Sequence, residues 1–376
     1  MKQLRVSAGR AVVAGFVLGS MAACDVPEAP EWVVGTTVPL SSDTFSWIDF
    51  LPSAVDTATV DGRKVFVLNV PQDSVAYRLS KVCPACVALH GDTVQIPPFD
   101  FADSIDIPFP ENLVSIGVDE ASLTADVDNG LNFDLVGPSS QFDTLPTLVL
   151  VLRDLATGAT IDSLWLQRGA DSLPAGSRWS PTLSISDTEV VDGVRLVVRL
   201  MYPGSEVVVE IDTMRVAALL AKLDGAQIAY VTLLLDDAEW DDGDAVRLDQ
   251  QTRDEIVDRF QTGEITAVIY HDLEATGNLE ISFAATSALL FSGDPLNELR
   301  FANLDLASGL EQTVEVTLEE FEQIATFPDP FYVGYRGVVN GTRSGLGGRT
   351  RLARISADQF AQLNFRLRSR LRVGGR

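Results

Sequence analysis

Apolar and polar residues alternate most clearly between positions 121 and 135. The apolar positions are Leu123, Ala125, Val127, Leu131, Phe133 and Leu135, and the polar positions are Thr124, Asp126, Asp128, Asn132 and Asp134. A period of two is typical of a β-strand that buries one face. The Asn129-Gly130 pair inside this stretch indicates a turn or a bulge, because both residues accept left-handed backbone conformations.

Strand-like composition recurs along the chain. Segments rich in β-branched, aromatic or alternating residues are 64–70, 92–96, 147–152, 160–166, 179–185, 194–201, 206–211, 227–235, 265–270 and 365–373. Turn signals such as Thr157-Gly158, Asp192-Gly193 and Pro203-Gly204 separate several of them. Short strands at this spacing predict antiparallel β-sandwiches.

A few short helices are expected among the strands. They are 214–223 after a cap at Asp212 or Thr213 and before Gly225, 249–261 before Gly263, 317–325 with Thr317 and Glu320 spaced as a capping box, and a last one where Ser356 and Gln359 have that spacing again. Caps of this kind satisfy the free backbone groups at helix ends. The theme of short strand, capped helix and long strand forms a weak internal repeat.

The fold class that these patterns predict is mainly β, with tandem antiparallel β-sandwich-like domains and three or four short helices. The alternative is a sheet closed on itself. The expected divisions are a signal peptide over 1–23, a Pro-broken tether over 24–41, a small β-rich region over 42–112, a β-sandwich-like domain over 113–237 and a β-rich domain with short helices over 238–376.

The first 23 residues have the layout of a secretory signal. Lys2, Arg5 and Arg10 form a positive start, an apolar run follows over 11–21, and small Ala22-Ala23 precede Cys24. The apolar run is too short to span a bilayer, which needs about 20 residues. The chain is therefore expected to leave the cytoplasm.

The stretch Met21-Ala22-Ala23-Cys24 resembles the lipobox of bacterial lipoproteins, although the family usually has Leu where Met21 stands. The resemblance implies that Cys24 is diacylated and becomes the new N-terminus. It also implies a lipid-anchored protein of the bacterial cell envelope, on the periplasmic or the outer-membrane face, with the membrane as its first partner. The alternative is ordinary cleavage nearby, which leaves Cys24 as a free thiol.

Charge is distributed unevenly along the chain. The whole sequence has a net charge of −25, but residues 336–376 hold ten Arg and a single acid, Asp358. The acidic remainder repels nucleic acid, so a nucleic-acid partner is not expected. Solubility of an exported protein is a sufficient reason for the acidic excess.

Cys83 and Cys86 are separated by Pro84-Ala85. Outside the cytoplasm two cysteines at this spacing predict a structural disulfide. A redox role and a metal site remain alternatives, with His90 as a third metal ligand. Because no second cysteine pair accompanies them, we expect neither a metal nor a cofactor.

The acidic segment 236–244 invites comparison with calcium loops, because hard cations prefer clustered carboxylates. It departs from the EF-hand pattern, since Ala238 and Trp240 stand where oxygen ligands are needed. A solvated turn between strands is the favoured interpretation, and calcium binding is the alternative.

The last strand carries the sharpest pattern of charge. Arg366, Arg368, Arg370 and Arg372 alternate with Phe365, Leu367, Ser369, Leu371 and Val373. Four guanidinium groups on one face could recognise phosphate, a lipid headgroup or an acidic glycan. The favoured interpretation is a solvated face that complements neighbouring acidic strands and discourages edge pairing.

Catalytic motifs do not stand out, so the protein is not expected to be an enzyme. His90 and His271 are the only histidines, and neither a nucleophile elbow nor a phosphate-binding loop occurs. The favoured function is a lipid-anchored binding or structural module, with an envelope protein or a glycan as partner. A carrier of lipid or another hydrophobic ligand, and a surface hydrolase, are the alternatives.

The region from 121–135 to Pro203-Gly204 is also similar to late-embryogenesis-type-2 sandwiches. The shared features are a strand with an internal Asn129-Gly130, an L-P-A-G turn at 173–176 and the Pro203-Gly204 turn. These motifs are short and common, so the similarity implies a sandwich fold and transfers no functional residue.

Overall fold

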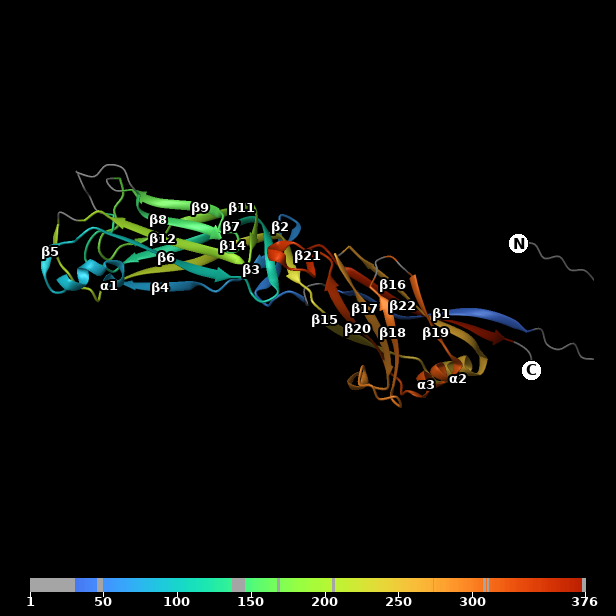
Figure 1. Cartoon of the computed structure of the whole chain (residues 1–376). Coiled ribbons are helices and arrows are strands. Elements are labelled where there is room, and N and C mark those ends of the chain that lie inside the picture. Colours follow the sequence, from blue (N-terminus) through green and yellow to red (C-terminus); the bar gives the residue numbers. More distant parts are fainter. Residues whose placement is uncertain are drawn as a thin grey trace, which may run out of the picture.

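The computed structural model describes residues 31–45, 50–136, 146–167, 170–204, 207–272, 274–306, 309 and 311–373. Within them the chain forms two β-sandwich units placed end to end, which give an elongated molecule (Figure 1). The expected signal peptide, Cys24 and the start of the expected tether lie outside the described residues. We call the unit that holds both described ends of the chain the proximal unit, and the other the distal unit.

The distal unit is built around β7 (Leu113–Asn129) and β14 (Val216–Leu234), which pair in antiparallel fashion. The same sheet contains β2 (Val55–Val60), β3 (Arg63–Leu68), β4 (Asp73–Arg78), β10 (Arg178–Trp179), β11 (Thr182–Val191) and β21 (Leu352–Ser356). The facing sheet contains β6 (Phe99–Pro108), β12 (Gly193–Tyr202), β8 (Pro146–Asp154) and β9 (Thr160–Gln167).

Small elements close the far end of the distal unit (Figure 1). They are α1 (Leu79–Val82), a 3₁₀ turn (Pro84–Leu89), β5 (Thr93–Gln95) and β13 (Val208–Glu210). β5 and β13 pair with each other rather than with the large sheets.

The proximal unit packs two four-stranded sheets, counted over the described residues, and carries two helices at one end. The first sheet has the order β1 (Trp32–Phe45), β22 (Ala361–Val373), β16 (Phe260–His271) and β19 (Glu311–Val316). The second has the order β15 (Ala238–Val246), β20 (Phe331–Gly341), β17 (Ala275–Ala284) and β18 (Glu298–Asp305). The helices are α2 (Gln250–Arg259) and α3 (Leu318–Thr326), and 3₁₀ turns lie at Ser287–Leu289 and Leu346–Gly348.

The fold class is confirmed: the described chain is mainly β, with tandem antiparallel sandwiches and short helices. The alternation that predicts a strand at 121–135 is also confirmed as far as Asn129, because Leu123, Ala125 and Val127 are buried and Asp126 is half-buried. The strand ends at Asn129, whose buried side chain donates to the carbonyls of Phe133 and Leu173 at 2.8 and 2.7 Å.

Gly130 is required by this turn. A Cβ atom at Gly130 would lie 2.2 Å from the carbonyl oxygen of Val216 on β14, a distance that side chains do not tolerate. The Asn129-Gly130 pair therefore ends a strand where two backbones approach closely, as one of the two expected interpretations proposes.

Two of the expected helices are confirmed. Asp249 caps α2 by accepting a hydrogen bond from the Thr252 amide at 3.0 Å. Thr317 and Glu320 form the complete capping box of α3. At Ser356 the structure has a turn instead of a helix, in which the Gln359 side chain accepts from the Ser356 amide at 2.8 Å.

The helix expected over 214–223 is wrong, because the residues from Val216 onward form the first part of the strand β14. Leu219 and Ala221 are buried, and the strand pairs with β4 and β7. Gly225, the expected helix stop, lies in a register shift between Asp224 and Gln227. Long-range pairing here overrides the high helix propensity of Ala and Leu.

The expected tether is wrong from residue 32 onward, where β1 pairs with β22 along its length. Pro39, which suggested an irregular segment, lies beside a break in register on an edge strand, where a missing N–H is tolerated. The division at 112–113 is also wrong: β3 and β4 pair with β14, and β6 pairs with β12, so both sides share one sandwich.

A buried arginine joins the two helices of the proximal unit. Arg253 on α2 is 2 % exposed. Its Nε donates to the carbonyl of Leu248 at 2.7 Å, and its Nη1 donates to the carbonyls that end α3, at Phe327 and Ala325. The last carbonyls of a helix lack partners within the helix, so this guanidinium satisfies them.

Replacing this arginine is therefore expected to destabilise the proximal unit. Arg253→Met should lower the free energy of unfolding by about 2–4 kcal/mol, because buried carbonyls lose charged donors. Urea unfolding followed by tryptophan fluorescence measures the change. Arg259→Met, at an exposed position of the same helix, should change it by less than about 0.5 kcal/mol. Equal unfolding midpoints for the two variants would refute this role of Arg253.

Candidate functional site

The predicted arginine face lies on β22, between β1 and β16. Its alternation is confirmed: Phe365 and Leu367 are buried, whereas Arg366, Arg370 and Arg372 are exposed. Arg368 is half-buried. The β1–β22–β16 pairing therefore places four guanidinium groups on the outer face of the first proximal sheet.

Acidic side chains from neighbouring strands meet part of this face. Arg368 contacts Glu311 on β19 at 2.8 Å and Glu264 on β16 at 3.6 Å. Arg372 pairs with Glu31. Because these pairs are largely exposed, each contributes about 0–1 kcal/mol to stability. They do lower the positive charge that the face presents to an anion.

An open depression crosses this sheet next to Arg368 and Arg370. Its volume is about 680 Å³, and its walls include Gly35, Thr37, Thr262 and Glu315. Hydroxyls, carboxylates and guanidinium groups line it, so it offers donors and acceptors together. That composition suits a neutral polar chain such as a glycan or a peptide better than a bare anion.

The predicted cysteine pair lies at the far end of the distal unit. Cys83 and Cys86 are fully buried, and their sulfur atoms are bonded at 2.07 Å. The pair connects the end of α1 to the following 3₁₀ turn. The bond thus joins a helix of four residues to a 3₁₀ turn of six residues.

His90 lies close to this disulfide in the sequence, and its side chain contacts Thr213. Its Nδ1 accepts from the Thr213 amide at 3.3 Å and lies 3.0 Å from the Thr213 hydroxyl. This contact joins the segment after the 3₁₀ turn to the segment after β13. Over the described residues, no group of three or more His, Cys, Asp or Glu side chains is arranged to hold a metal ion.

The acidic segment 236–244 is mostly a strand and not a turn. Its residues from Ala238 onward form β15, an edge strand in the described sheet that pairs with β20. The pattern misled because solvated acids are common in turns, yet they also protect sheet edges against unwanted pairing. Asp236 and Asp237 precede the strand and bind Arg351.

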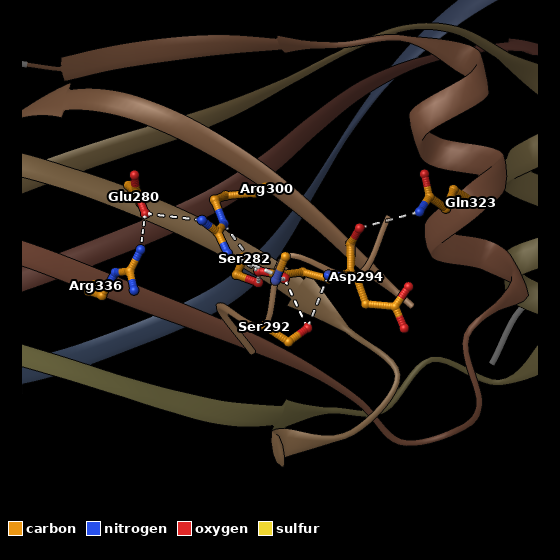
Figure 2. A network of polar contacts seen from close by, with 9 residues as sticks. Glu280, Ser282, Ser292, Asp294, Arg300, Gln323 and Arg336 are labelled. Carbon is orange, nitrogen blue, oxygen red and sulfur yellow. Dashed lines mark hydrogen bonds and ion pairs between the residues drawn. The ribbon is translucent and has the colours of Figure 1, made fainter. Parts of the chain in front are cut away.

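Sequence reasoning missed a second polar cluster, on the outer face of the other proximal sheet (Figure 2). At its centre is Glu298 on β18, and this residue is 5 % exposed. Its carboxylate accepts from the Ser282 hydroxyl at 2.7 Å, the Gly293 amide at 2.5 Å and Arg300 at 3.1 Å. Ser292 adds a fourth hydrogen bond at 3.2 Å.

These contacts tie the segment between β17 and β18 onto the sheet. Arg336 on β20 contacts Glu280 at 2.8 Å (Figure 2). Its guanidinium lies 4.9 Å from the ring centre of Phe291. Gln323 on α3 donates to the carbonyl of Pro295 at 2.8 Å. The cluster therefore fastens one segment to β17, β18, β20 and α3 at once.

The hydrogen bonds of this cluster hold the segment between β17 and β18 in place. Burial raises the pKa of Glu298, but the hydrogen bonds from Ser282, Gly293 and Arg300 outweigh it, and the net pKa lies below the ordinary value. Such a carboxylate stays ionised and keeps its donors in place. The short spacing of Glu298 and Arg300 was a sequence signal, since residues two apart share a strand face.

Small apolar cavities lie in the cores of both units. Two apolar cavities have a volume of about 10 Å³ each, one between Trp240 and Leu363 and the other between Ile107 and Ile185. Space of this size holds at most one water molecule. No helix in the described part of the chain combines the length and the apolarity needed to cross a bilayer.

Comparisons with known proteins find distant likeness only. No protein-family model matches the chain, and no curated protein does. A Parabacteroides distasonis protein named as secreted is 12 % identical; the match covers 90 % of this chain and 99 % of that chain, with a TM-score of 0.36. The cowpea mosaic virus empty particle is 10 % identical over 77 % of this chain and 93 % of that chain, with a TM-score of 0.18. At these values the likeness assigns neither a family nor a function.

The lowered pKa of Glu298 predicts a specific dependence of stability on pH. The stability that its ionisation adds is present above the ordinary carboxyl pKa, about 4.5, and is lost as the pH falls through the lowered value. Glu298→Gln should therefore cost about 2–3 kcal/mol near pH 7 and much less near pH 3. Urea unfolding at both pH values measures the difference.

Glu274→Gln is the matched control, because Glu274 forms an exposed pair with Arg343 at 3.1 Å. Its cost should stay below about 1 kcal/mol at either pH. If the loss of stability in Glu298→Gln is as large at pH 3 as at pH 7, the hydrogen bonds of this cluster do not depend on the charge of Glu298.

The disulfide predicts that both cysteines resist alkylation under two separate conditions. Iodoacetamide should leave Cys83 and Cys86 unmodified in the native protein, and also in the unfolded protein without reductant. Unfolding together with reduction should expose both thiols, because they are buried and bonded to each other. Peptide mass spectrometry measures the added mass, and alkylation of the unfolded, unreduced chain would contradict the bond.

Proposed function

We propose that this protein is a lipid-anchored module of the bacterial cell envelope that binds or supports a partner and does not catalyse a reaction. The observation that carries the proposal is the pairing of β1 with β22. It brings the chain from the lipobox-like segment into the outer end of the proximal unit. The distal unit then lies at the opposite end of the molecule (Figure 1).

Anchoring rests on the residues around Cys24. A positive start, a short apolar run and two small residues before a cysteine are the features that lipoprotein processing uses. Two or three acyl chains would hold the protein stably, whereas one chain would bind only weakly. The anchor assigns the protein to the periplasmic or outer-membrane face of the envelope.

The shape suits presentation of the distal unit. β14 has 19 residues, which corresponds to roughly 60 Å of extended chain for the distal unit alone. Strands that run along the long axis resist bending because each is paired on its neighbours. A stiff support of this kind would hold its far end well away from the bilayer.

Binding is supported by the depression beside Arg368 and Arg370. Its mixture of hydroxyls, carboxylates and guanidinium groups suits an envelope glycan or a polypeptide segment. The two cavities of about 10 Å³ are too small for an acyl chain, which disfavours the hydrophobic-ligand carrier. His90 contacts Thr213, and His271 contacts the carbonyl of Leu306, so neither contact favours a hydrolase.

The anchor is tested by following fatty acid on the protein. In cells fed a labelled fatty acid, the wild-type chain should carry the label, and its N-terminal peptide should begin at Cys24 with a diacylglyceryl mass. Cys24→Ser should lose the label at least about tenfold, because it lacks the thiol that accepts the lipid. Protein purification followed by mass spectrometry gives both readouts.

The matched control replaces the other two cysteines. Cys83→Ser with Cys86→Ser removes the disulfide and should keep both the label and the start at residue 24. Label that persists on Cys24→Ser, or a wild-type mature chain without acyl mass, would refute the anchor.

A further inference from the structure

The outermost end of the proximal unit is a ribbon formed by β1 and β22 alone. Pairing of β16 with β22 ends at Phe260 and Leu371, whereas β1 continues along β22 to the pair Trp32 and Val373. The two strands project beyond the rest of the unit in Figure 1. We call residues 32–34 and 370–373 the ribbon tip; Arg370 and Leu371, at its base, still pair with Thr262 and Phe260 on β16.

The ribbon tip exposes apolar side chains on both of its faces. Trp32 is 58 % exposed, Val33 is 55 % exposed and Val34 is 44 % exposed. Successive residues of a strand point to opposite faces, so Val33 and its two neighbours are solvated on different sides. Three consecutive exposed apolar residues differ from the scattered ones of an ordinary surface.

Two arginines accompany these residues. Arg370 and Arg372 are exposed on β22, opposite Gly35 and Val33. Arg372 pairs with Glu31, while Arg370 has no ion pair or hydrogen bond to another side chain of the described residues. A guanidinium group binds phosphate oxygens in a bidentate manner, and tryptophan prefers the boundary between apolar and wet surroundings.

The short segment between Cys24 and Trp32 limits how far the ribbon tip can lie from the proposed lipid anchor. Trp32 follows Cys24 by eight positions. Eight residues span at most about 28 Å when fully extended. The ribbon tip therefore cannot leave the neighbourhood of the bilayer that holds acyl chains on Cys24, and that bilayer offers both an apolar boundary and phosphate groups.

We propose that the ribbon tip enters the phospholipid headgroup layer. Trp32 and the two valines lie at the boundary with the acyl chains, and Arg370 contacts headgroup phosphates. This inference rests on the proposed lipid anchor and deepens it. The tip is a second contact with the membrane, and two contacts set the direction of the rod where a single contact would not.

The acids of the distal unit do not oppose this contact. Charges in water are screened within about 8 Å at physiological ionic strength. The acids of the distal unit lie at the opposite end of the molecule, and Glu31 is paired with Arg372. Residues of the ribbon tip therefore decide the interaction with the headgroups, and of its two described arginines it is Arg370 that has no ion pair with another described residue.

The test uses the lipidated full-length mature protein, purified from membranes and reconstituted into phosphatidylcholine vesicles. Bromine on the lipid acyl chains near the headgroups quenches tryptophan emission only at short range. Trp32 is one of five tryptophans, so about a fifth of the emission should be open to quenching. Trp32→Phe should remove this quenching, and Arg370→Glu should reduce it at least about twofold by repelling phosphate.

Matched controls separate the ribbon tip from other surfaces. Trp165 on β9 of the distal unit is 55 % exposed, and Trp165→Phe should leave the quenching unchanged. Arg366→Glu changes an exposed arginine of the same strand that lies farther from the tip, and it should have little effect. All four substitutions are at solvated positions, and urea unfolding checks that each variant folds.

The outcomes distinguish the inference from the anchor on which it rests. Vesicle flotation first measures whether the protein is membrane-bound. Protein that floats but shows equal quenching in wild type and Trp32→Phe overturns the ribbon-tip contact and leaves the anchor standing. Protein that does not float with the vesicles overturns the anchor, and the ribbon-tip contact fails with it.

Discussion

The arrangement of the whole molecule depends on the antiparallel pairing of β1 with β22. These strands come from opposite ends of the chain, and Trp32 pairs with Val373. Without β1, the strand β22 would lose one of its two neighbours and become an edge. Because β22 also pairs with β16, the N-terminal strand is joined to the sheet that supports the arginine face. This pairing thus determines where the N-terminal strand joins the fold and which end of the rod lies nearest to that strand.

Other long-range contacts turn the two sandwiches into one rod. The chain passes between the units before β2, after β14, and on both sides of β21. At the junction, Leu235 donates to the carbonyl of Arg351 at 2.9 Å, and Gly341 donates to the carbonyl of Leu235 at 3.0 Å. Asp236 and Asp237 bind the Arg351 side chain. Several crossings with shared hydrogen bonds restrain bending more than one linker would.

Local signals in the sequence predicted the features that local physics decides. The alternation at Leu123, the capping box at Thr317 and the alternating arginines of β22 all appear in the structure. The segments that failed depend on distant partners. Residues 32–41 contain Gly35 and Pro39, which suggest an irregular tether, and only β22 reveals them as a strand. A segment rich in Ala and Leu became part of β14 for the same reason.

The Glu298 cluster shows the same limit for the candidate site. Its members come from four elements and from the segment between β17 and β18, and most of the contacts join groups that are far apart in sequence, such as Ser282 with Glu298 and Gln323 with Pro295. In the sequence each is an ordinary polar residue. Only the folded sheet places Ser282 and Gly293 where both donate to Glu298. A buried carboxylate with four donors is then stable, whereas the same group without them would be strongly unfavourable. The cluster thus depends on the sheet, and the segment it fastens covers a face that would otherwise be open to water.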